Sequence, residues 1–485
     1  MNSGKLNTTT DILFESESTG MFDSFINYIF WILLILYTNP GGIIDAFGLF
    51  YISGKINAGD LLFVALTVCY LVIPKKHTVF DLDFLKVRKY LLIFLIYYLV
   101  VFIILVPFYN ENKDFSIAGN LIKARYTVYI ILLSIYMYEF FKRRWDIFFK
   151  VFLFSSIIVL TMFIITVVSG LTLLPVGLMN RDYVNIERNL MVSEGLMPLL
   201  IPLGAVIIVF NLKIKFRFLI LAGFSLMSLV YVLELWRRNI LAVFIFFILA
   251  VLAEVFITKR YSIIFNNAVK VVTLLALVVA VSYLLVPRYV DAAVLGIQKS
   301  FSVVEGKRNV EGEKDVRMTL DRPFINEKFY KHPFFGTGFD NRWRTKMGDE
   351  QGFEAADYPF LSALAMFGIV GVLLFLPIYV VIVKILRLDF NYLRTHNDTV
   401  TRSFLYLFLM GFLLYFVFHL AQYFNYFQAL SNSDSFYWYF LLTLYLAGRS
   451  RFYSHELAKN NIELNYIPGN PHAPVIRTRA YQPQN

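Results

Sequence analysis

A series of long apolar runs, separated by short polar loops, constrains the fold of this chain more than any other feature. A helix needs about 20 apolar residues to cross roughly 30 Å of hydrocarbon, and runs near that length recur along the sequence. Lipid offers no hydrogen-bond partners, so the backbone of each run must bond within its own segment, as a helix does. We therefore predict an all-α polytopic membrane protein with about twelve transmembrane helices, near residues 24–39, 59–74, 90–109, 124–141, 146–169, 190–211, 216–236, 239–257, 267–286, 358–386, 402–425 and 435–448.

Composition supports this class and argues against two others. Of the 485 residues, 58% are hydrophobic and 16% are charged, so the apolar surface is too large to be buried in one soluble core. The formal net charge of +11 could indicate nucleic-acid binding, but most of the surplus lies in alternate loops, where membrane orientation explains it. We predict a lipid bilayer as a partner and no nucleic acid.

The orientation follows from clusters of Lys and Arg in every second loop. Short cytoplasmic loops carry such an excess, and the clusters here are "PKK", "KVRK", "KRR", "KIKFR", "TKR" and "KILR". Both chain ends are then cytoplasmic. The predicted organisation is a cytoplasmic segment 1–23, transmembrane helices 1–9 in 24–286, a large periplasmic or extracellular loop 287–357 between spans 9 and 10, transmembrane helices 10–12 in 358–448, and a disordered cytoplasmic tail 449–485.

Several arginines at the predicted outer face run against this charge rule. Arg237 and Arg238, in "ELWRRNIL", stand between two apolar runs with no linker. They could extend to lipid headgroups or pair with Glu234, or they could form a preorganised anion site, because the guanidinium fork matches phosphate. Position alone leaves both readings open. Further external cations are Lys123, Arg125, Arg181, Arg188, Arg317 and Arg322.

The stretch "KHPFFGTGFDN", residues 331–341, predicts a tight turn in the external loop. Pro333 and two glycines interrupt any helix there, and we expect a short helix between Arg322 and the proline. Gly336 and Gly338 supply backbone conformations that a side chain would obstruct, so the turn can fold back over the membrane mouth with its phenylalanines at the interface. His332 is a candidate acid or base, although a lone histidine beside proline is more often structural. No metal site or cofactor is predicted.

The order of these features resembles the O-antigen ligase and O-antigen polymerase superfamily. The resemblance covers roughly residues 236–376: the arginine pair, the external loop with "HPFFGTGFDN", and "DYPFLSALAMFGIVGVLLFL" leading into the next span. It implies a metal-independent, GT-C type glycosyltransferase that takes an oligosaccharide from undecaprenyl diphosphate and transfers or polymerises it during surface polysaccharide biosynthesis. It also implies a bacterial cytoplasmic (inner) membrane location, an active site facing the periplasm or exterior, a glycan or lipid acceptor, and polysaccharide assembly proteins as partners.

The resemblance and the reaction chemistry together suggest roles for the external residues. Negative charge develops on the leaving diphosphate, and Arg237, Arg238 and Arg317 are the residues predicted to stabilise it. The ligases carry a histidine in an "HNxxL" pattern before the span that follows the loop, whereas this chain has "DYPFL". Asp357 is therefore either the catalytic base or the N-cap of the next helix. The residues predicted to bind substrate are Arg322, Arg181, Arg188, Lys123, Arg125 and His332.

Two other classes compete with the enzyme. A transporter or flippase of lipid-linked sugars would suit twelve spans, but it should show repeat symmetry or charges near mid-membrane. The sequence shows little of either, with Glu194, Glu254 and His419 as the main polar exceptions. A non-catalytic membrane scaffold is the third reading. The glycosyltransferase is the favoured prediction.

Overall fold

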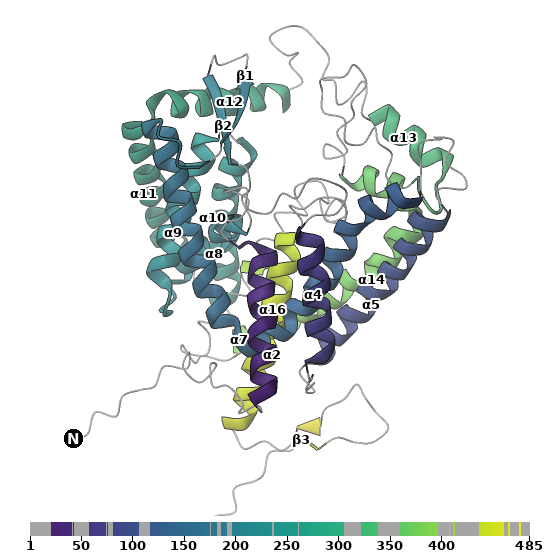
Figure 1. Ribbon diagram of the computed structural model, residues 1–485. Helices are drawn as coiled ribbons and strands as arrows, with labels where there is room; N and C mark the ends of the chain where they lie inside the picture. Colours follow the sequence, from purple (N-terminus) through teal and green to yellow (C-terminus); the bar gives the residue numbers. More distant parts are fainter. Residues whose placement is uncertain are drawn as a thin grey trace, which may run out of the picture.

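The computed structural model describes most of the helical part of the chain. The residues described are 21–40, 42, 58–73, 75, 81–105, 117–174, 176–181, 186–191, 196–234, 237–259, 261–304, 322–337, 359–395, 407, 411–412, 436–459, 464–465 and 475–476. Figure 1 shows that these residues form mainly long helices, with short strands at two places.

The helices and strands follow one another in this order: α2 (Met21–Thr38), α4 (Ala58–Val72), α5 (Leu82–Tyr98), the π-helix η2 (Leu99–Leu105), α7 (Ile117–Ser169), β1 (Val176–Arg181), β2 (Ile186–Met191), the 3-10 turn η3 (Met197–Leu199), α8 (Leu200–Phe210), α9 (Arg217–Leu233), α10 (Arg237–Thr258), α11 (Ser262–Leu285), α12 (Pro287–Val304), α13 (Arg322–Lys331), α14 (Pro359–Thr395), α16 (Phe436–Lys459), β3 (Leu464–Asn465) and β4 (Val475–Ile476).

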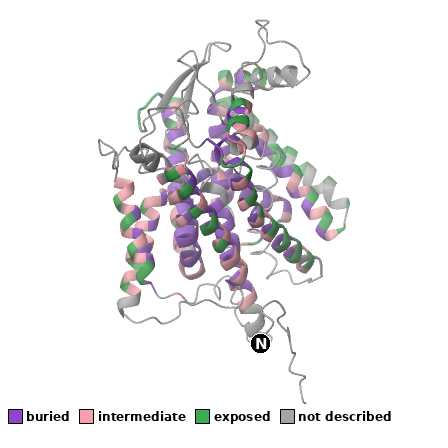
Figure 2. Ribbon diagram, turned by 90° about the vertical axis from the view of Figure 1, so that its right-hand side faces the viewer, coloured by how far each residue is buried: buried purple, intermediate pink, exposed green. Residues whose placement is uncertain are grey.

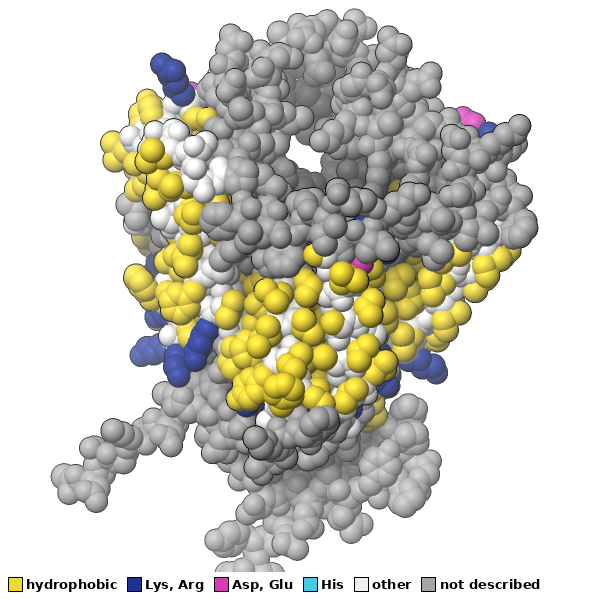
Figure 3. Space-filling view, viewed as in Figure 1, with side chains coloured by type: hydrophobic (Ala, Val, Ile, Leu, Met, Phe, Trp, Pro, Cys, Tyr) yellow, Lys and Arg dark blue, Asp and Glu magenta, His cyan; other side chains and the backbone are white. Residues whose placement is uncertain are grey.

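Exposed apolar stripes on several helices are typical of a membrane protein. Along α4, Leu61, Val64, Val68 and Leu71 recur at helical spacing, and each is at least 56% exposed. Such stripes form the band of hydrophobic side chains in Figure 3, and a band of this size is stable against lipid but not against water. Among the described residues, four helices are long and apolar enough to cross a membrane: Leu82–Leu105, Ile147–Ser169, Asn239–Thr258 and Leu364–Tyr392.

The number of spans, about twelve by sequence, stays a prediction, and one of the predicted spans is wrong in its first part. Instead of a helix from residue 190, the chain forms β2, which pairs with β1 in an antiparallel hairpin from Val176↔Met191 to Arg181↔Ile186. The 3-10 turn η3, which contains Pro198, precedes the helix α8, and Pro202 lies in the first turn of α8, where proline is tolerated. Its 11 residues cover about 16 Å, too short to cross the hydrocarbon core.

Two other segments differ from the expected pattern of spans and loops. The predicted spans 124–141 and 146–169 both lie in α7, which has no loop between them but a non-helical residue, Arg144, at φ −141° and ψ 35°. The predicted loop 287–357 begins with a helix, α12, that the sequence reading did not expect. The predicted span 402–425 lies almost wholly outside the described residues.

The helices pack around a core of aromatic and aliphatic side chains. Helix α7 contacts α9 on one side and α16 on the other, and α5 packs along α14. At the centre, Phe440 of α16 meets Phe141 and Phe148 of α7, with ring centroids 5.1 Å and 5.4 Å apart. Figure 2 shows the buried residues along the inner faces of these helices. The packing of α5, α7, α14 and α16 sets the positions of the polar groups at both ends.

The two ends of the molecule differ in character. Figure 1 shows the β1–β2 hairpin, α12 and α13 at the upper end and β3 at the lower end. The exposed Lys213 and Lys215, in the loop before α9, belong to the predicted cytoplasmic end, and many of the Lys and Arg side chains visible in Figure 3 lie below the hydrophobic band. We use "outer end" for the end that carries the hairpin, α12 and α13, and "inner end" for the other.

We predict that the outer end faces away from the cytoplasm. In a background in which Cys69 is replaced by Ser, Tyr330→Cys should react with a membrane-impermeant maleimide in sealed right-side-out vesicles, because Tyr330 on α13 is 76% exposed. Lys213→Cys, exposed at the inner end, should react only after the vesicles are permeabilised. The reverse labelling pattern would invert the topology.

Candidate functional site

The central feature of the outer end is a break in helix α14. Gly368, the tenth residue of the helix, has φ 68° and ψ 177°. A helix residue with these angles interrupts the hydrogen-bond ladder, so carbonyl and amide groups on both sides lose their helical partners. Such groups are costly in a membrane unless other parts of the protein bond them.

The turn after α13 fills this break. Backbone hydrogen bonds join the two segments: Thr337 N to Ala365 O (2.8 Å), Ile369 N to Pro333 O (2.8 Å) and Val370 N to Phe334 O (3.1 Å). The Thr337 hydroxyl also donates to Ala365 O at 3.2 Å. The "HPFFGT" sequence therefore supplies the bonding partners that the interrupted helix needs.

Two glycines permit this close approach. Gly336 has φ 78°, and an added Cβ would overlap the Met366 carbonyl and lie 2.7 Å from Gly368 N. The relation is reciprocal, since a Cβ on Gly368 would overlap the Phe334 carbonyl and lie 2.6 Å from Gly336 N. Both positions exclude a side chain by backbone conformation and by space. The prediction that Gly336 forms a tight turn is confirmed, while Gly338 lies outside the described residues.

A third segment, helix α5, holds the same break. The Tyr97 hydroxyl donates a hydrogen bond to Phe367 O at 2.5 Å. The Tyr97 ring lies over Gly371, where an added Cβ would be 2.7 Å from Cε1. Phe94, one turn earlier on α5, packs edge-on against the Phe367 ring with centroids 5.7 Å apart. The sequence analysis did not identify Tyr97 or Gly368 as important. The one available signal for the break was that Gly368 is a glycine within an apolar run.

The break lies near the start of the apolar stretch of α14, because Gly368 is the fifth residue of the candidate span Leu364–Tyr392. The part of α14 that follows Gly368 has enough residues to extend about 40 Å, which exceeds the roughly 30 Å hydrocarbon core. Phe334 and Phe335 of the turn are 64% and 45% exposed, as expected for aromatic side chains at a lipid interface. We call the joined segments the turn–break contact (residues 333–337 with 365–370), and their hydrogen bonds fix the turn to this end of α14.

Other predicted site residues lie on backbone segments at the same end. Arg237 and Arg238 begin α10, and the preceding Glu234, which is buried, accepts a hydrogen bond from Met191 N at the end of β2 (2.8 Å). This bond attaches the β1–β2 hairpin, which contains Arg181 and Arg188, to the end of α9, where Glu234 is the C-cap residue shortly before α10 begins. The side chains of these four arginines lie outside the described part of the structure.

Helix α12 covers the same region. Its buried Ala292 and Ala293 pack with Ile240 in the first turn of α10. Figure 1 shows α12 lying across the ends of the long helices instead of continuing α11. The hairpin, the start of α10 and α12 thus form one connected group at the outer end.

Arg125 has a clear structural role. Its guanidinium pairs with Asp60 at 3.0 Å, and the Tyr129 hydroxyl donates to the other oxygen of Asp60 at 2.7 Å. This ion pair attaches the start of α4 to α7. The contact favours a role for Arg125 in helix packing over a role in substrate binding. Lys123 belongs to α7, but its side chain lies outside the described part.

The remaining predicted site residues belong to α13 and the loop around it. Arg322 is the first residue of α13, whose existence the sequence predicted. His332 is half-buried, and its carbonyl accepts a hydrogen bond from Gly336 N at 2.9 Å, so its backbone helps to close the turn. The side chain of Arg322 and all of Arg317 and Asp357 lie outside the described residues.

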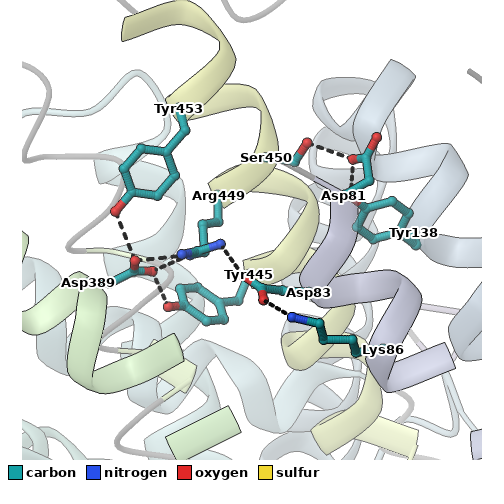
Figure 4. A network of polar contacts seen from close by, with 9 residues as sticks. All are labelled: Asp81, Asp83, Lys86, Tyr138, Asp389, Tyr445, Arg449, Ser450 and Tyr453. Atoms are coloured by element: carbon teal, nitrogen blue, oxygen red, sulfur yellow. Dashed lines mark hydrogen bonds and ion pairs between the residues drawn. The ribbon is translucent and has the colours of Figure 1, made fainter. Parts of the chain in front are cut away.

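A second polar cluster, which sequence analysis did not predict, lies at the inner end (Figure 4). Arg449 of α16 binds both oxygens of Asp389 at 2.9 Å and pairs with Asp83 at 2.7 Å. Tyr445 and Tyr453 donate hydrogen bonds to Asp389, the latter at 2.8 Å. We call these residues the Arg449 cluster.

A neighbouring carboxylate extends this cluster to α7. Asp81, fully buried, pairs with Lys142 at 2.6 Å and accepts hydrogen bonds from Tyr138 and from Ser450 (2.7 Å). Each carboxylate of the cluster thus has a cationic partner in contact. Buried charges that are paired in this way fix helices relative to one another, and here they join α5, α7, α14 and α16.

Within the described residues, no group of three or more His, Cys, Asp or Glu side chains is placed to hold a metal ion. Comparison with known protein families gave no match to this chain, and comparison with curated proteins gave none.

We predict that Gly336→Ala and Gly368→Ala release the turn–break contact, because each Cβ would meet backbone atoms of the other segment. The measurement is the rate of tryptic cleavage after Lys331, which should rise when the turn is freed. Gly170→Ala is the control, since Gly170 has φ 73° with no atom near the added Cβ and so carries a similar conformational cost without the overlap. Equal cleavage rates in all three variants would contradict the contact.

We predict that Arg449→Met lowers the free energy of unfolding by roughly 3 to 5 kcal/mol, because it leaves the buried Asp389 carboxylate without its cation. Thermal unfolding in detergent measures the effect as a lower midpoint. The control is Lys86→Met, whose ion pair with Asp83 is 3.9 Å long, between side chains that are 43% and 27% exposed, and should contribute at most about 1 kcal/mol. Similar midpoints for both variants would show that the cluster does not stabilise the packing.

Proposed function

We propose that this protein is a membrane glycosyltransferase similar to the O-antigen ligases and polymerases. It transfers an oligosaccharide from undecaprenyl diphosphate to a glycan or lipid acceptor on the outer side of a bacterial cytoplasmic membrane. One observation carries the proposal most directly: the turn–break contact anchors α13, which begins at Arg322, at the same end of the molecule as the start of α10 with Arg237 and Arg238.

The proposed reaction is a displacement at the anomeric carbon of the donor sugar. The bond from this carbon to the diphosphate oxygen breaks, and a bond to the acceptor oxygen forms. The acceptor proton passes to a base, for which Asp357 is our candidate. The diphosphate leaves with the bonding electron pair, and Arg237, Arg238 and Arg317 stabilise the charge that develops on it.

The location of the fixed segments agrees with this chemistry. The diphosphate of a polyprenyl donor lies at the membrane surface while its lipid tail stays in the hydrocarbon. Both the first turn of α10 and the turn–break contact lie at the outer end, where such a headgroup can reach them. Two of the substrate-binding candidates, Arg181 and Arg188, belong to the hairpin bonded to the same region.

The transporter alternative has one feature in its favour, the interrupted helix α14. In transporters, such breaks lie near mid-membrane and expose backbone groups to the substrate. Here the break lies near the start of the apolar stretch of α14, and the turn and Tyr97 bond the groups that it frees. The interrupted helix therefore supports an anchored external segment more than a transport pathway.

We predict that Arg237→Ala, Arg238→Ala and Arg317→Ala each reduce the rate of glycan transfer by roughly 100- to 1000-fold, the usual effect of removing one donor to a developing anion. The measurement is transfer from purified undecaprenyl-diphosphate oligosaccharide to acceptor by the protein in nanodiscs. Replacement by Lys should restore little, because Lys lacks the planar fork. Asp357→Asn retains a helix cap but cannot accept a proton, so it separates the base from the cap.

The control for these variants is Lys213→Ala, which removes an exposed positive charge at the inner end and should transfer glycan at the normal rate. Normal transfer by all three arginine variants would contradict the proposed function. A normal rate and pH profile for Asp357→Asn would exclude Asp357 as the base while leaving the arginines in place.

A further inference from the structure

The hydroxyl of Tyr97 makes a contact that the packing of α5 alone does not require. Ring packing against Gly371 would be the same for phenylalanine, yet the hydroxyl reaches Phe367 O at 2.5 Å. Phe367 is the residue before the break at Gly368, so its carbonyl is among the groups whose helical partner is lost. The bond therefore holds the break itself.

We propose that Tyr97 is a positioning residue. It holds the turn–break contact, and this contact fixes the position of α13 relative to α14 at the outer end. This inference rests on the proposed function, because the group to be positioned is the external segment that acts on the diphosphate. Tyr97 acts through the backbone of α14 and does not touch the substrate.

The packing of α13 explains why a bond at Phe367 controls its position. Helix α13 packs on α14, with Ile325 and Lys328 buried in the contact region. The turn that follows α13 is bonded on both sides of the break, to Ala365 before it and to Ile369 after it. A change in the angle between the two parts of α14 would therefore move α13.

Helix α5 is suited to hold this angle because it is fixed at its other end. Asp83, in the first turn of α5, pairs with Arg449 of α16 at 2.7 Å, and Asp81 just before the helix pairs with Lys142 of α7. The Arg449 cluster thus joins α5 to the rest of the bundle. At the outer end, the same helix presents Tyr97 to the break, directly before the π-helix Leu99–Leu105.

The competing explanation is that the Tyr97 hydroxyl only stabilises the fold. Two measurements on one variant distinguish this explanation from the positioning role. Tyr97→Phe keeps the ring and removes only the hydrogen bond. Hydrogen exchange of the full-length protein in nanodiscs reports on the amides of Thr337 and Ile369, which bond across the contact. Steady-state kinetics with undecaprenyl-diphosphate oligosaccharide report kcat and KM. Tyr90→Phe, on the same helix nearer the inner end, is the matched control.

The proposal expects Tyr97→Phe to speed exchange at both amides about three- to tenfold, as expected for the loss of one hydrogen bond, and to lower kcat by a similar factor. The KM for donor should stay within about twofold, because binding contacts are retained. Tyr90→Phe should change neither measurement. Faster exchange with an unchanged kcat would overturn the positioning role, and so would unchanged exchange.

The same experiment separates this inference from the proposed function. A wild-type protein that transfers no glycan would overturn the proposed function and, with it, any role of Tyr97 in transfer. A wild-type protein that transfers glycan, combined with a Tyr97→Phe variant of normal kcat, would overturn the positioning role alone.

Discussion

The organisation of the outer end depends on one backbone contact, in which Gly336 and Gly368 allow two chain segments to meet without side chains between them. Interrupting a helix near a membrane frees polar backbone groups, and the cost of leaving them unbonded is several kcal/mol each. The turn after α13 bonds these groups directly, so the break and the turn stabilise one another. Helix α13 is therefore attached to the bundle at a defined point.

The two ends of the protein use polar groups in different ways. At the inner end, paired and buried charges join four helices. Asp81, Asp389 and Arg449 all take part in these contacts between helices, so their role is structural. At the outer end, the described contacts are mostly backbone hydrogen bonds, while the arginines of α10 and the hairpin are borne on segments that packing already holds. A rigid inner end and an anchored outer end suit a protein that holds a charged headgroup at the membrane surface.

The sequence predicted the features that depend on local pattern. Continuous apolar runs located helices such as α9 and α10, and Pro333 with Gly336 predicted the turn. The β1–β2 hairpin replaced the start of a predicted span because hydropathy does not show strand pairing, although its strands are close in sequence. Features that depend on distant partners were not predictable either. The turn's partner lies some 30 positions away, Asp60 precedes its partner Arg125 by 65 positions, and Asp83 precedes Arg449 by 366, so no periodicity connects them.

The central claim is that the outer end of this bundle holds the diphosphate of a lipid-linked glycan. Cryo-electron microscopy of the protein in lipid nanodiscs with a bound undecaprenyl-diphosphate oligosaccharide tests it most directly. We expect the diphosphate to lie at the outer end, in contact with Arg237 or Arg238 at the start of α10 and on the side of α13. Density for the diphosphate near mid-membrane, or beside the Arg449 cluster at the inner end, would contradict it.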